Sequence, residues 1–98
     1  GTKVRLTLTN LDAMDHNLIM VEPGSAARVA IAAASLEAEG VKLQWKPESD
    51  KILFASKLLA RDEKETMEFV APPTPGRYEY ICTFPGHWQL MRGVMIVE

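Results

Sequence analysis

One short segment near the end of the chain carries three side chains that can bind a metal ion. Cys82, His87 and Met91 lie within ten residues and offer a thiolate, an imidazole and a thioether. A second imidazole must come from His16, the only other histidine in the sequence. A thiolate, two imidazoles and a weak axial thioether form the ligand set of a trigonal copper site that shuttles one electron. The four residues therefore predict a mononuclear copper centre.

The same residue types explain why such a site would exchange electrons readily. Sulfur ligands favour Cu(I), whereas imidazole serves both oxidation states, so neither state is strongly preferred. Pro85 stiffens the loop and lacks a backbone N–H, and Gly86 permits tight curvature beside His87. We therefore expect a rigid ligand loop.

Each ligand taken alone also has an ordinary structural explanation. Cys82 could be a buried core cysteine, His16 a hydrogen-bonded core histidine and Met91 core filler. Their joint spacing around one strand and the loop that follows it favours the metal site.

The elements that position these residues are mostly strands. Alternating apolar and polar residues, or short apolar runs, predict strands at 3–9, 16–21, 52–55, 64–70, 77–82 and 93–97. His16 then begins a buried strand, and Cys82 ends another. The pattern is typical of an all-β sandwich.

One helix interrupts this pattern. It is expected from Ala26 to Ala38, with Ser25 as the N-cap and Gly40 as the stop. The segment 41–50 lacks a clear period, and we leave it unassigned.

Length and composition exclude several other classes of protein. The 98 residues fit one domain, 1–98, and 47% apolar with 24% charged residues is ordinary for a folded protein. A net charge of −2 provides no basic surface for nucleic acid. No apolar stretch approaches the roughly 20 residues that span a bilayer. The single cysteine cannot form an intrachain disulfide.

The ligand motifs resemble those of a known family. The segment 82–87 (Cys-Thr-Phe-Pro-Gly-His), followed by Met91, and the upstream segment 14–17 (Met-Asp-His-Asn) resemble the azurin and auracyanin branch of the cupredoxins, the blue-copper proteins. The resemblance implies a Greek-key β-sandwich with one inserted helix, which here lacks the first strand or strands. It also implies that His16, Cys82 and His87 are equatorial copper ligands and that Met91 is the axial one.

The resemblance assigns roles to residues around the ligands. Asn17 matches an asparagine that braces the two ligand loops and supports the cysteine sulfur, and Thr83 adjoins the sulfur in the chain. Asp15 stands where azurins have a glycine whose carbonyl approaches the copper.

The resemblance also implies a partner and a compartment. Met14, Pro85, Trp88 and Leu90 are expected to form an apolar rim around His87, where a c-type haem protein or haem domain would dock. The expected location is periplasmic or otherwise extracytoplasmic. The chain also resembles modules of larger bacterial haem-containing, dehydrogenase-like proteins. An open sheet edge could instead pair two copies of the chain.

Rival functions remain to be separated from electron transfer. A copper enzyme would need histidines beside the cysteine, but Ile81 and Thr83 flank Cys82, and both histidines are already used. A metal-free sandwich for interaction or assembly is the main alternative. Zinc could also substitute in the same pocket, because it accepts sulfur and nitrogen ligands.

Overall fold

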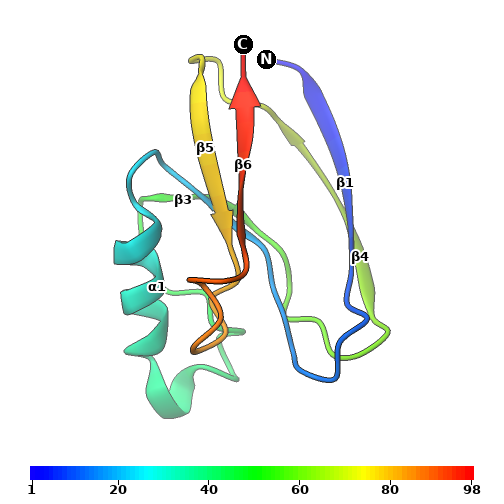
Figure 1. The fold of residues 1–98 in the computed structure, drawn as a ribbon, viewed down its shortest axis with the longest axis vertical. Coiled ribbons are helices and arrows are strands. Elements are labelled where there is room, and N and C mark those ends of the chain that lie inside the picture. Colours follow the sequence, from blue (N-terminus) through cyan, green and yellow to red (C-terminus); the bar gives the residue numbers. More distant parts are fainter.

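The chain folds into two antiparallel sheets and one short helix. The computed structural model describes all 98 residues. One sheet pairs β1 (Lys3–Thr9) with β4 (Lys64–Val70). The other has the order β3-β2-β5-β6, formed by Ile52–Ala55, Ile19–Val21, Gly76–Ile81 and Arg92–Val97. The helix α1 (Ala26–Ala34) follows β2 (Figure 1).

Alternation of residue type explains the two-stranded sheet. Leu6 lies opposite Met67 on the half-buried face, while Thr7 lies opposite Thr66 on the exposed face. The two threonine hydroxyls are hydrogen-bonded at 2.9 Å. Cross-strand pairs of like character fix the register, because a slip of one residue would exchange the two faces.

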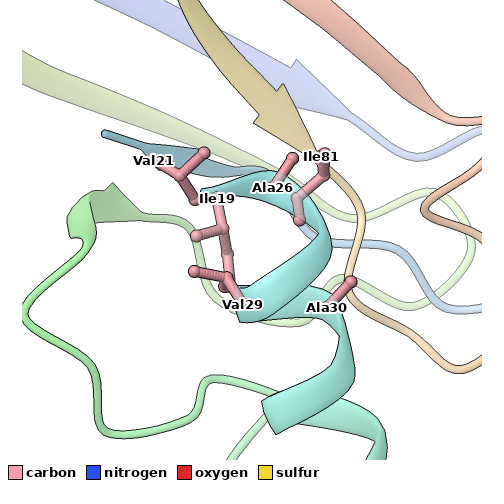
Figure 2. Close-up of a cluster of buried hydrophobic side chains, with 6 residues drawn as sticks. All are labelled: Ile19, Val21, Ala26, Val29, Ala30 and Ile81. Atoms are coloured by element: carbon pink, nitrogen blue, oxygen red, sulfur yellow. The ribbon is translucent and has the colours of Figure 1, made fainter. Parts of the chain in front are cut away.

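The core lies between α1 and the middle of the four-stranded sheet. Figure 2 shows the side chains of Ile19, Val21 and Ile81 packed against those of Val29 and its neighbours on the helix. Ile19, Val21 and Val29 have no exposed surface. On the opposite face of this sheet, Phe54 stacks on Phe69 of β4 with ring centroids 3.8 Å apart. The two sheets are therefore packed as a sandwich.

The central pairing of β2 with β5 determines where the metal ligands lie. Ile19 is paired with Ile81, so His16 precedes one strand and Cys82 follows the other at the same end of the sheet. The loop from Cys82 leads into β6, which pairs back on β5. Both chain termini lie at the opposite end of the molecule (Figure 1).

Two predicted elements are shorter than expected. The strand predicted at 16–21 begins only at Ile19, because the N–H of Leu18 is hydrogen-bonded to the Ser56 hydroxyl instead of a strand partner. His16 forms only an isolated bridge with Leu59.

The helix was predicted from Ala26 to Ala38, and the last four residues of that prediction are wrong. A 3-10 turn, Glu37–Glu39, follows α1, and Glu37 takes a left-handed φ of 48° that an α-helix cannot contain. The Ser25 side chain makes no capping hydrogen bond. Gly40 does not end the α-helix; it makes room for the Trp45 ring, which a Cβ at this position would overlap.

Each sheet has one edge strand next to the same open groove. β1 pairs only with β4, and β6 pairs only with β5. A groove of about 630 Å³ runs between the end of β1 and the start of β6, and Cys82 and Met91 contribute to its lining. The predicted all-β sandwich with one helix is confirmed. No helix of the structure has the length and apolarity that a membrane crossing requires.

Candidate metal centre

Three of the four predicted ligands meet in space. The Sγ atom of Cys82 lies 3.7 Å from the Nδ1 atom of His16 and 3.7 Å from the Nδ1 atom of His87. The donor atoms of the three residues all lie within 4.8 Å of one another. The two imidazole rings are tilted by 39° with centroids 4.9 Å apart. Both histidines therefore present the same ring nitrogen to the sulfur.

These separations fit a single bound metal ion. An ion about 2.3 Å from a sulfur and about 2.0 Å from a nitrogen, at a trigonal angle, holds the two donors about 3.7 Å apart. Both observed sulfur–nitrogen distances are close to this value, at 3.7 Å. A soft thiolate with two imidazoles suits copper or zinc better than a hard cation such as magnesium.

Burial sets the protonation of the metal-free site. Loss of solvent raises the pKa of the Cys82 thiol, although the backbone N–H groups of Asn17 and Phe84 act in the opposite direction by stabilising the thiolate. Loss of solvent also lowers the pKa of His87, and the nearby His16 adds to this effect, while Asp12 opposes it. Because a metal ligand must be a thiolate or a neutral imidazole, a bound cation would release the Cys82 proton.

Asn17 and Thr83 join the two ligand segments by hydrogen bonds. The Oδ1 atom of Asn17 accepts from the N–H of Thr83 at 2.8 Å, and its Nδ2 atom donates to the Thr83 hydroxyl at 2.8 Å. Both residues are buried. This pair therefore fixes the residue after His16 to the residue after Cys82.

The irregular segment 41–50 supplies the next support. Asn17 Nδ2 also donates to the Gln44 carbonyl at 3.1 Å, and the Thr83 hydroxyl donates to the Trp45 carbonyl. Gln44 and Trp45 take left-handed φ angles of 56° and 55°, which cost energy in residues other than glycine. The role of Gln44 and Trp45 as hydrogen-bond acceptors could not be found in the sequence, because it depends on two consecutive residues with left-handed backbone angles.

The ligand loop is closed by its own backbone. The N–H of Met91 donates to the carbonyl of His87 at 2.8 Å, and the N–H of Cys82 donates to the carbonyl of Met91 at 3.0 Å. Gly86 has a φ of 86°, so the expected use of glycine for tight curvature is met. Met91 lines the groove beside Cys82 and is 40% exposed.

The other predicted site residues lie on this loop or directly before His16 in the chain. Leu90 is 90% exposed and Met14 is 49% exposed. Pro85 is also exposed, whereas Trp88 is half-buried and packs against the hydrophobic core, with the Arg92 guanidinium 5.5 Å from its ring centroid. Asp15 is half-buried and makes no side-chain hydrogen bond.

Sequence reasoning missed the support on the other side of His16. The Nε2 atom of His16 is hydrogen-bonded to the Asp12 carboxylate at 2.9 Å. Buried Asn10 holds this turn by donating to the carbonyls of Met14 and Leu59, both at 2.8 Å. The spacing of four residues between Asp12 and His16 was the available signal.

Comparison with known proteins gives one consistent result. The family model for copper binding proteins of the plastocyanin/azurin family matches residues 1–98. The chain is 36% identical over 99 residues to auracyanin-A from Chloroflexus aurantiacus, covering 100% of this chain and 60% of that protein. It is 30% identical to azurin from Pseudomonas chlororaphis, covering 89% of this chain and 68% of azurin.

The chain belongs to the copper-binding plastocyanin/azurin family. The solved structure of auracyanin A, described as a "blue" copper protein, superposes with a TM-score of 0.88 at 34% identity and covers 100% of this chain and 80% of auracyanin A. The predicted cupredoxin relationship is thereby confirmed. This cupredoxin spans 60% of auracyanin-A and 42% of auracyanin-B, so it corresponds to only part of these relatives.

We predict that Asn17→Ala lowers the free energy of unfolding of the metal-free cupredoxin by about 1–3 kcal/mol, because the buried N–H of Thr83 loses its acceptor. Chemical unfolding measures this change. Thr7→Val removes an exposed hydroxyl–hydroxyl bond and should stay within about 0.5 kcal/mol of the parent. Equal stability of the two variants would show that the Asn17 brace is not needed.

Proposed function

We propose that this cupredoxin transfers single electrons through one blue copper ion, as a carrier or as a module of a larger protein. The observation that carries the proposal is the meeting of one buried thiol with two imidazole nitrogens, each 3.7 Å from the sulfur. Residues 1–98 act as one domain in this proposal. Family membership supports an extracytoplasmic location, and we propose the periplasm.

In this proposal His16, Cys82 and His87 are the equatorial ligands and Met91 is the axial ligand. A copper ion held there supplies reversible change between Cu(II) and Cu(I). The protein contributes a fixed set of donors, because the Asn17–Thr83 bonds and the loop hydrogen bonds hold the ligand segments together. A site that moves little on reduction exchanges electrons with a small structural cost.

The ligand inventory favours a carrier over a copper enzyme. The chain has two histidines and one cysteine, and all three contribute donors to the same cluster. A second copper centre, at which bond chemistry could occur, has no histidine left in this chain. The metal-free interaction domain gives no reason for three donor side chains to converge.

Titration of the metal-free protein with Cu(II) tests the proposal. We expect one equivalent to give an intense visible thiolate-to-copper absorption and a higher melting temperature, because the ion binds only the folded state. The Cys82→Ser variant should bind Cu(II) without this visible absorption. The absence of both colour and stabilisation in the parent would favour the metal-free interaction domain. Zinc should bind the same pocket without colour and be displaced by copper.

A second variant, studied in the same titration, tests the role of Met91 as the axial ligand. Met91→Leu should keep the colour but raise the reduction potential, because a weak donor that stabilises Cu(II) is lost. Voltammetry measures the potential. An unchanged or lower potential would contradict Met91 as the axial ligand.

We propose that a c-type haem protein or haem domain docks on the apolar surface formed by Met14, Pro85, Trp88 and Leu90. Pro85, Trp88 and Leu90 lie on the loop that includes His87, and Met14 lies two residues before His16, so docking there gives a short path to the metal. Leu90 and Met14 offer exposed apolar area, and Trp88 underlies this rim by packing on the core. A small apolar contact permits fast release after transfer.

Leu90→Glu should slow reduction of the oxidised protein by a ferrous c-type cytochrome and leave the visible spectrum unchanged, because a charge replaces an exposed apolar contact. Stopped-flow absorption measures the rate. Val70→Glu is the matched control, since Val70 is 65% exposed and is paired with Lys3 at the start of β1, close to the N-terminus and away from the ligand loop. A normal rate in Leu90→Glu would exclude Leu90 from the docking surface.

The free edges of β1 and β6 support a dimer of the 98-residue chain as a further part of the proposal. Unpaired backbone groups on an edge strand can pair with a strand of another copy. Sedimentation that reports only monomer at every concentration would contradict it.

A further inference from the structure

The two histidines of the centre differ in how their outer ring nitrogens are held. His16 Nδ1 faces the Cys82 sulfur, and His16 Nε2 lies 2.9 Å from the Asp12 carboxylate. His87 also turns Nδ1 to the sulfur, but its Nε2 atom has no hydrogen-bond partner in the structure. The site therefore contains one carboxylate-supported imidazole and one unsupported imidazole.

The hydrogen bond to Asp12 selects the protonation pattern of the neutral His16 ring. A carboxylate only accepts hydrogen bonds, so the proton of the ring must be on Nε2. The lone pair is then on Nδ1, which is the atom that faces Cys82. A carboxylate behind a metal-bound histidine also raises the basicity of the ligand and fixes the ring orientation.

Asp12 is held in place for this contact. Its backbone N–H donates to the Asn10 side-chain oxygen at 2.9 Å, and its second carboxylate oxygen, Oδ1, accepts from the N–H of Ala13 at 2.6 Å. The other oxygen, Oδ2, is the one that contacts His16. Asn10 is 4% exposed, so the turn that presents the carboxylate is anchored in the fold.

We propose that Asp12 is a positioning residue of this centre that keeps His16 in the Nε2-protonated form and lowers the reduction potential by stabilising the more highly charged Cu(II). The effect on the potential rests on the proposed copper function, whereas the effect on the ring does not. The opposed ring, His87, lacks such a contact, so the two equatorial imidazoles are inequivalent as donors.

The first test uses metal-free protein and nitrogen NMR of the histidine rings at about pH 8, above the ordinary histidine pKa. We expect His16 to be protonated at Nε2 in the parent. Asp12→Ala should shift the ring toward a mixture of tautomers, while Asp12→Asn retains an acceptor oxygen and should keep the parent pattern. A parent ring protonated at Nδ1, or a ring unaffected by Asp12→Ala, would overturn the positioning role.

The second test measures the reduction potential and the Cu(II) affinity of the loaded protein. Asp12→Asn removes the charge but keeps an acceptor, so the potential should rise and Cu(II) affinity should fall about 10-fold or more relative to Cu(I) affinity. A tenfold change in that ratio corresponds to about 59 mV for one electron.

Asp15→Asn is the matched control for charge, because Asp15 adjoins His16 in the chain but makes no hydrogen bond to it. Equal reduction potentials for Asp12→Asn and Asp15→Asn would mean that any nearby negative charge has the same effect as Asp12, which would overturn the tuning role. If the parent failed to bind copper at all, the proposed function would fall, and the NMR test would still decide whether Asp12 positions His16.

Discussion

The pairing of β2 with β5 is the constraint on which the metal centre depends. Ile19 and Ile81 are paired in register and almost fully buried against α1. Because the strands are antiparallel, the residues before Ile19 and after Ile81 leave the sheet at the same end. His16 and Cys82, 66 positions apart in sequence, are thereby brought to within hydrogen-bond range of each other. A slip in this register would separate the sulfur from the imidazole.

Hydrogen bonds around the ligands fix the position of the two ligand segments more closely than the pairing of β2 with β5 does alone. Asn17 ties the first ligand segment to the second, and the carbonyls of Gln44 and Trp45 tie both to the segment after the helix. Buried polar groups of this kind are costly when unpaired, so they select one arrangement of the loops. The metal donors are held before any ion binds, which is what low structural change on reduction requires.

The surroundings of the cluster differ from one side to the other. His16 is 8% exposed and supported by a carboxylate, while His87 is half-buried and lies on a loop whose neighbour Leu90 is almost fully exposed. One side of the centre is therefore anchored in the fold, and the other is open to solvent. This division supports the proposed transfer of electrons through the exposed side.

Residue types and local spacing alone were enough to predict the cluster of His16, Cys82 and His87, the family relationship and most of the strands. A lone cysteine followed by histidine and methionine in a loop with Pro-Gly is compatible with few kinds of chemical site. The alternation of apolar and polar residues in β1 and β4 is visible in the sequence. Only the tertiary structure decided where α1 ends and what supports His16. The shortened helix follows from the left-handed φ of Glu37, and the roles of Asp12, Gln44 and Trp45 follow from atoms brought together by folding. The contacts of Gln44 and Trp45 join segments that are distant in the chain and depend on unusual backbone angles, which no local pattern records, whereas the spacing of four residues between Asp12 and His16 was a local signal for that contact.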